Sequence, residues 1–438
     1  MKFYISNKES MFQIIRGIIA VVISGMTFMI VLIRACYSNI WYDEAFTYMY
    51  YVLPIVKNPS FSIIRNFWED SLANNHWLNT LLIALFTKLS HIYWEEIIIR
   101  LPNIMFSLIY LIFLAYLFFK KKINLLLFIL LSCNYYFIDY MRQARGYGMC
   151  AILVFFSIYF LENWRINKYE NQSYLIWGLI FLMLSAYANS VALIPLFAYG
   201  LVILIRLIEN KKLFDFIKKY WIFLIIYFIF SFIIIKYHFM ISNIDNGKPL
   251  FKTENTSLPF IIKSYLSWII PNYLVNIAFL AVIVILVISI TYIIIKTHRF
   301  KCDSGLSMLL YVGCLVSMNL IFKRGGLLER TLLPGYTLVI IGTYNIIHDA
   351  YLLLLKSLTR ENFKKFIRYI LKLGTILLSL CLFINFINNI HPLESGYWKI
   401  VEFQDADKVD WTNKNDDPAE EFYKNKKEWN IQQLTPLK

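Results

Sequence analysis

The chain has 438 residues and a formal net charge of +15; 59% of its residues are hydrophobic and only 16% are charged. Soluble domains carry about 25% charged residues, and apolar runs near 20 residues recur here along almost the whole length, which excludes a soluble globular class. Such runs cross a bilayer core about 30 Å thick, whereas barrel strands alternate in short segments. The sequence therefore predicts an all-α polytopic membrane protein.

Basic residues collect in short loops between the apolar runs, where they set topology rather than bind nucleic acid. Placing these loops in the cytoplasm puts the N-terminus inside and the C-terminus outside, with about eleven transmembrane helices. The predicted helices cover about residues 12–33, 97–120, 124–137, 147–161, two helices turning at 188–190, 221–240, 274–295, 306–322, 331–347 and 370–387. Residues 1–390 form the predicted transmembrane domain, with a first outer segment at 35–96, and residues 391–438 form a short polar outer tail. The first run is predicted to remain as a signal-anchor helix.

The segment "HWLNTLLIALFTKL" at residues 76–89 is apolar but too short to be a span, and it contains Asn79, Thr80, Thr87 and Lys88. Counting it as a span would invert the basic loops that follow. We therefore expect a short amphipathic helix that lies at the outer membrane interface.

Two adjacent carboxylates, Asp43 and Glu44, lie among aromatic residues in "WYDEAFTY", shortly after the first apolar run. Like charges in an apolar setting cost free energy unless a partner pairs with them or a reaction uses them. One interpretation is a helix cap, with Asp43 at the N-cap. The other is a general base at the outer face.

Two predicted outer turns carry basic residues where the topology rule expects few. The first, "IDYMRQARGYG", contains Asp139, Arg142 and Arg145, and the second, "KRGGLLERTLLP", contains Lys323, Arg324, Glu329 and Arg330. These residues either solvate and bridge helix ends or form a pocket for phosphate, which the planar guanidinium binds through two parallel hydrogen bonds.

An acidic pair facing basic turns suits sugar transfer from a phosphate carrier. A carboxylate can deprotonate an acceptor hydroxyl as it attacks the activated sugar carbon, while arginines stabilise the departing phosphate. A phosphate leaves readily as an anion, so no second carboxylate is needed as an acid, in contrast to glycoside hydrolysis.

Five segments occur in the order "WYDEAFT", "NNHWLNTLLIALFTKL", "EEIIIRLPNIMFSLIYLIFLAYLFFKK", "YYFIDYMRQARGYG" and "ERTLLPGYTLVIIGTYN", over residues 41–345. This order resembles the membrane-embedded GT-C glycosyltransferases, in the branch of the protein mannosyltransferases and the lipid A aminoarabinose transferase. Those proteins have an acidic pair after the first helix, a His-containing juxtamembrane helix, an Arg-Leu-Pro opening the next span, and arginines in two later outer turns.

The resemblance implies a GT-C-like bundle acting at the periplasmic face of a bacterial inner membrane, with a polyprenyl-phosphate sugar donor and inversion at the anomeric carbon. It implies that Asp43 is the base, with Glu44 beside it in the catalytic pair. Arg100 is implied to be architectural. Donor-phosphate binding is implied for Arg142, Arg145, Arg324 and Arg330. The acceptor or donor pocket is implied to include His76 and Tyr147.

The size and short tail are similar to the phage-borne glucosyltransferases that decorate O-antigen. This favours glucose as the sugar and O-antigen lipopolysaccharide, or another surface glycan, as the acceptor. The chain departs from the family where "HPPL" is replaced by His76-Trp77-Leu78, and where Asn189 occupies the place of a frequent histidine.

A glycan polymerase and a lipid-linked oligosaccharide flippase remain alternatives. A flippase should carry charged residues at midspan and broken helices in internal repeats, and a polymerase should have its large outer loop in the second half. We expect no cofactor; a divalent ion near Asp43, Glu44 and His76 is conceivable, but no ligand spacing supports it. The six cysteines lack metal or redox spacing and are predicted to be reduced packing residues.

Overall fold

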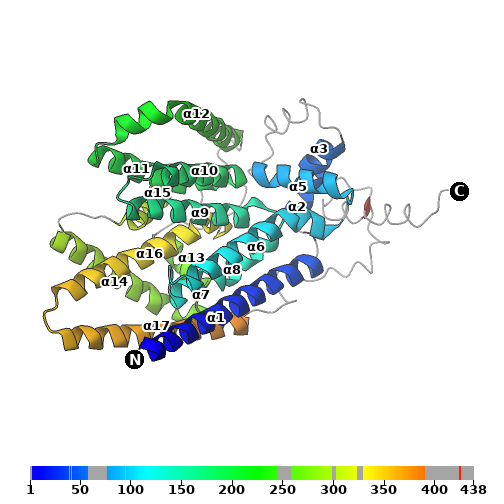
Figure 1. Cartoon of the computed structure of the whole chain (residues 1–438). Coiled ribbons are helices and arrows are strands. Elements are labelled where there is room, and N and C mark those ends of the chain that lie inside the picture. The colour runs from blue at the N-terminus through cyan, green and yellow to red at the C-terminus, as the bar shows by residue number, and fades with distance from the viewer. Residues whose placement is uncertain are drawn as a thin grey trace.

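The computed structural model describes residues 2–38, 40, 42–57, 76–93, 95–244, 258–297, 302–322, 329–389 and 424–425. Every regular element within these ranges is a helix, which confirms the predicted all-α class (Figure 1). The predicted polar tail lies outside the described residues, apart from 424–425.

Eight helices in the described part of the chain are long and apolar enough to cross a membrane, as expected of a multi-pass protein. They lie in α1 (Lys2–Tyr37), α6 (Glu96–Phe119), α9 (Gly146–Ile166), the 3-10 turn η2 (Ser190–Ala192) continued by α11 (Leu193–Glu209), α12 (Leu213–Ile244), α14 (Asn272–Thr297), α16 (Glu329–Ser357) and α17 (Glu361–Asn389). Two shorter apolar helices occupy further predicted spans, α10 (Gln172–Ala188) and α15 (Asp303–Phe322). A total of eleven crossings stays a prediction.

The predicted span at 124–137 is not one continuous helix. It is divided into α7 (Leu125–Ser132) and α8 (Tyr135–Arg142), which meet at a bend of 47°. The cause is Asn134, whose side-chain oxygen accepts a hydrogen bond from the Phe137 amide at 2.8 Å and so starts a new helix. Asp139 and Arg142, predicted in an outer turn, therefore lie on α8.

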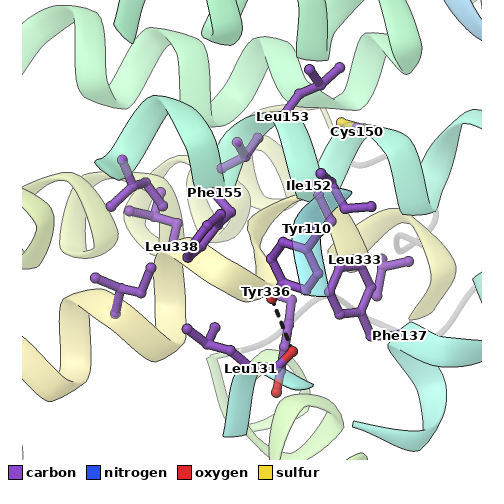
Figure 2. Close-up of a cluster of buried hydrophobic side chains, with 14 of the residues drawn as sticks. Tyr110, Leu131, Phe137, Cys150, Ile152, Leu153, Phe155, Leu333, Tyr336 and Leu338 are labelled. Atoms are coloured by element: carbon purple, nitrogen blue, oxygen red, sulfur yellow. Dashed lines mark hydrogen bonds between the residues drawn. The ribbon is translucent and has the colours of Figure 1, made fainter. Parts of the chain in front are cut away.

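The helix α9 lies at the centre of the bundle and is the most buried of the eight. It packs against α6, α8, α10 and α16, and aromatic rings of α6, α8, α9 and α16 lie together in the core (Figure 2). Tyr110 packs edge-on against Phe137 and Phe155, and its hydroxyl donates to the Leu131 carbonyl at 3.0 Å. Membrane interiors offer no water to a buried hydroxyl, so such internal partners are required.

The helices α1 and α6 run antiparallel and side by side (Figure 1). The Nε of Arg16 donates to the Phe118 carbonyl at 3.1 Å near one end of the pair. Ser24 Oγ donates to the Leu111 carbonyl at 3.3 Å further along. At the other end of the pair, a hydrogen bond between Arg100 and the Ala35 carbonyl joins the start of α6 to the last turn of α1.

A group of short helices covers that other end (Figure 1). They are α2 (Tyr42–Thr47), the π-helix η1 (Tyr48–Val52), α3 (Leu53–Lys57) and α5 (Trp77–Ser90). The ring of Pro54 clashes with the carbonyl four residues earlier in an α-helix, which explains the wider π-turn before it. The short helix predicted at 76–89 is confirmed as α5; its place at the membrane interface stays a prediction.

Candidate functional site

A buried ion pair joins α2 to α6. Glu44 and Arg100 are both fully buried, and the Arg100 fork donates from Nε to Oε1 at 3.1 Å and from Nη2 to Oε2 at 2.8 Å. The remaining nitrogen, Nη1, donates to the carbonyls of Ala35 at 2.8 Å and Ser38 at 2.7 Å. The pair thus fixes the acidic segment against the ends of two long helices, in agreement with the architectural role expected for Arg100.

The connection between α8 and α9, residues 143–145, is held through its backbone. The Ala144 amide donates to Glu44 Oε1, and the Ala144 carbonyl accepts from Asn79 Nδ2 at 3.0 Å. Asn103 Nδ2 donates to the carbonyls of Gln143 at 2.6 Å and Arg145 at 3.2 Å. Three buried side chains from three separate helices therefore fix the backbone position of Arg145.

The structure brings His76, predicted from one motif, together with Arg145 and Tyr147, predicted from another. Arg145 Nη2 lies 3.4 Å from His76 Nε2, and its guanidinium lies 5.2 Å from the centre of the Tyr147 ring. The His76 and Tyr147 rings meet edge to face at 4.9 Å. Since arginine only donates, a hydrogen bond between the two has His76 Nε2 as its acceptor.

The other ring nitrogen of His76, Nδ1, contacts the end of α10. Nδ1 lies 3.3 Å from the Ala188 carbonyl and 3.4 Å from Asn189 Nδ2. Asn189 also caps the following turn, since its side-chain oxygen accepts from the Val191 amide at 3.0 Å. Asn189, at the position where the resemblance predicts a histidine, thus contacts His76 at the N-terminus of α5.

Glycine in the "ARGYG" motif is required by close packing. A Cβ on Gly146 would lie 1.8 Å from the Ala188 carbonyl oxygen and 2.9 Å from His76 Nδ1. A Cβ on Gly148 would lie 2.4 Å from the Tyr140 carbonyl oxygen. Only glycine allows α9 to begin this close to α8, α10 and the histidine.

A second buried charge group lies beside the first and shares Ser38 with it. Arg142 Nη1 donates to Ser38 Oγ at 2.5 Å, and this oxygen also accepts from Arg100 Nη1 at 3.2 Å. Asp139 pairs with Arg142 Nε at 3.4 Å and with Arg34 Nη1. Arg142, predicted to bind phosphate, thus has two protein partners on α8 and at the end of α1.

Four arginines, at 34, 100, 142 and 145, are buried in this region, and the carboxylates at 44 and 139 pair with three of them. The region thus gathers several guanidinium groups, a side-chain type that binds phosphate through two parallel hydrogen bonds.

The remaining predicted site residues are placed only in part. Asp43 lies in the first turn of α2, which begins one residue earlier, so the N-cap interpretation does not fit the helix start; its side chain lies outside the described residues. Arg330 lies in the first turn of α16, with its side chain also outside them, and Arg324 falls outside the described ranges altogether.

Comparisons with protein-family models, curated proteins and solved structures find no match. The family resemblance therefore stays a prediction.

Sequence reasoning missed Arg34, Asn79 and Asn103 as parts of this site. Each is a polar residue inside or at the end of an apolar helix, and this signal was available, because such residues in membrane helices face the protein interior. Tyr48 is another buried polar residue that the sequence did not single out. Its hydroxyl donates to the Tyr93 carbonyl, and burial raises its pKa above the ordinary value. Within the described residues, no group of His, Cys, Asp and Glu is arranged to hold a metal ion.

Proposed function

We propose that this chain is a membrane glycosyltransferase of GT-C type that moves a sugar from a polyprenyl-phosphate carrier to a hydroxyl acceptor. The observation that carries the proposal is the gathering of four buried arginines, at 34, 100, 142 and 145, of which Arg100 binds Glu44 on the helix that also bears Asp43. Guanidinium groups gathered near an acidic helix fit a reaction in which a phosphate is bound and then released as an anion.

In the proposed reaction, Asp43 accepts the proton of the acceptor hydroxyl. The acceptor oxygen forms a bond to the anomeric carbon from the side opposite the phosphate, so the configuration inverts. The bond between that carbon and the phosphate oxygen breaks, and the phosphate leaves with the electron pair. Arg145 and Arg330, with Arg142 and Arg324 as neighbours, stabilise the charge on the departing phosphate.

The contacts of Glu44 support a positioning role in this scheme. Both of its oxygens bind Arg100, and Oε1 also accepts from the Ala144 amide, next to Arg145. Glu44 would thereby fix the distance between the base on α2 and the arginine at the start of α9. His76 and Tyr147 would orient the same guanidinium, since both contact it.

The proposal includes a place and partners for the reaction. The enzyme would lie in a bacterial inner membrane with about eleven crossings, an inner N-terminus, an outer C-terminus and its site at the periplasmic face. Glucose is the favoured sugar, and O-antigen or another surface glycan is the favoured acceptor. No cofactor is required by this chemistry, because the phosphate carrier already activates the sugar.

The test is transfer by the full chain in proteoliposomes with synthetic polyprenyl-phosphate glucose and a lipopolysaccharide acceptor. The wild type is expected to add single hexose units, and Asp43→Asn is expected to lose transfer by about a hundredfold or more. Asp215→Asn is the matched control, because Asp215 is an exposed carboxylate in the first turn of α12. Undiminished transfer by Asp43→Asn would remove the base; growth of long glycan chains, or movement of lipid-linked oligosaccharide without transfer, would favour the polymerase or the flippase.

A further inference from the structure

A groove lies on the membrane-facing side of α1 and α6, away from the candidate site. It has a volume of about 580 Å³. Its lining on α1 includes Gln13, Gly17, Ile18, Val21 and Val22, and Phe119 lines it from α6. Apart from Gln13, these are apolar residues, and Ile18, Val21 and Val22 are each more than half exposed. The groove is therefore open to whatever surrounds the helix pair.

The length and direction of the groove match one leaflet of a bilayer. The nine residue steps from Gln13 to Val22 span roughly 14 Å along α1. The hydrocarbon core is about 30 Å thick, and Gln13 lies near the start of the candidate span Met11–Tyr37, so the groove covers about half of the core from that side. This is the reach of a single acyl chain.

The boundary end of the groove is basic. Because α1 and α6 run antiparallel, the end near Gln13 lies beside the last turn of α6 and the exposed lysines that follow it, Lys120, Lys121 and Lys122. The ammonium of Lys120 lies 5.8 Å from the centre of the Phe119 ring, which itself lines the groove. Within the described part of the chain, none of these three lysines forms an ion pair.

Arg16 fixes the shape of this end rather than adding a free charge. Its Nε and Nη2 donate to the Phe118 carbonyl, Nη2 also donates to the Ile123 carbonyl at 3.1 Å, and its guanidinium stacks 4.1 Å from the Phe118 ring centre. These bonds satisfy carbonyls at the end of α6 and just after it, and they hold α1 at a fixed distance. Gly17 then leaves space beside Phe119, because a Cβ there would meet the ring only at 3.6 Å.

We propose that the groove binds one acyl chain of an anionic phospholipid, whose headgroup phosphate is held by Lys120, Lys121 and Lys122. The apolar lining fits the chain, and the lysines fit the phosphate at the membrane boundary. The topology rule predicts that this boundary is the cytoplasmic one, so the lipid site and the candidate transfer site lie at opposite ends of α1 and α6. The proposal does not depend on the proposed reaction.

The test is native mass spectrometry of the detergent-purified full chain, with phosphatidylglycerol and phosphatidylcholine of identical acyl chains. The wild type is expected to bind phosphatidylglycerol more tightly than phosphatidylcholine. Lys120→Gln is expected to weaken phosphatidylglycerol about fivefold, the factor that corresponds to about 1 kcal/mol for one lysine near a membrane surface. Glycerol phosphate, which has the charge but no acyl chain, is expected not to compete.

Two glycines on the same helix provide the matched comparison for the groove itself. Gly17→Leu fills the groove and is expected to abolish tight phosphatidylglycerol binding, whereas Gly25→Leu is expected to retain it, because nothing lies within 4 Å of a Cβ at Gly25. Equal binding of the two lipids, competition by glycerol phosphate, or equal losses in the two leucine variants would each overturn the proposal. Gly17→Ala, which makes only an ordinary contact with Phe119, is expected to remain folded and to bind.

Discussion

Arg100 binds both carboxylate oxygens of Glu44, although the two residues are 56 positions apart in the chain, and neither side chain is exposed. The pair connects the first helix of the outer segment to the start of α6, and Arg100 extends the link to the last carbonyls of α1. Glu44, which the sequence predicts as part of a catalytic pair, is thereby a structural anchor for its neighbour Asp43. Glu44 therefore holds the acidic segment in place, and Asp43 is the residue that we propose as the general base.

Glu44→Gln and Arg100→Gln should each lower the free energy of unfolding by about 3–5 kcal/mol. The reason is that each leaves one buried charge without its partner, which costs more than the pair contributes. The double variant should be more stable than the sum of the two losses predicts, because neither charge is then left behind. The stability of each variant is measured by thermal unfolding in detergent, which is monitored through labelling of the buried thiols of Cys133 and Cys150.

The control for this prediction is an exposed pair on α17. Glu361 lies 3.6 Å from Lys364, and its side chain is 59% exposed, so Glu361→Gln should change stability by less than about 0.5 kcal/mol. Additive losses at 44 and 100, or losses no larger than at 361, would contradict the account of a buried anchor.

Arg145→Ala should raise the donor KM and reduce kcat together, with a loss in kcat/KM on the order of a hundredfold or more. Arg145→Lys should restore little, because a point charge cannot reproduce the planar fork or its contact with Tyr147. Initial rates at varied polyprenyl-phosphate glucose give both constants.

Arg165→Ala serves as the comparison for Arg145. Arg165 lies near the other end of the same helix, where it pairs with Glu162 at 2.7 Å. Its loss should lower stability slightly and leave the donor KM within about twofold, because a partly exposed pair contributes little. A donor KM that responds equally to both changes would assign Arg145 to folding alone.

The helical class and the short helix after the first span follow from the sequence, because both depend on local composition and length. The break at Asn134 was also local: an asparagine within an apolar run can cap a new helix, and length alone did not reveal it. The predicted turn that carries Asp139 and Arg142 was wrong for the same reason.

The contacts between residues within the site could not be predicted from the sequence. Arg34 reaches Asp139, and Asn103 reaches the backbone on both sides of Ala144, across separations of 105 and about 40 positions. Periodicity and motif order assign residues to one face of a membrane, but they do not say which polar side chains meet there. His76, Arg145 and Tyr147 were predicted as neighbours in function; their contact with one another and with Asn189 depends on how α5, α9 and α10 pack.

Gly146→Ala should abolish transfer and lower stability more than an alanine does at most glycines. The added methyl would lie 1.8 Å from the Ala188 carbonyl oxygen, and this atom belongs to the backbone of α10, so α9 must move away from it. Any such movement shifts Arg145, which begins the same helix, relative to His76. Gly200→Ala is the matched control: nothing lies within 4 Å of a Cβ there, and alanine favours a helix by up to about 1 kcal/mol over glycine. Gly200→Ala should therefore keep or slightly raise the melting temperature and retain wild-type transfer, whereas a Gly146→Ala protein with normal melting and normal donor KM would show that the close approach of α9 to α10 is not what positions the arginine.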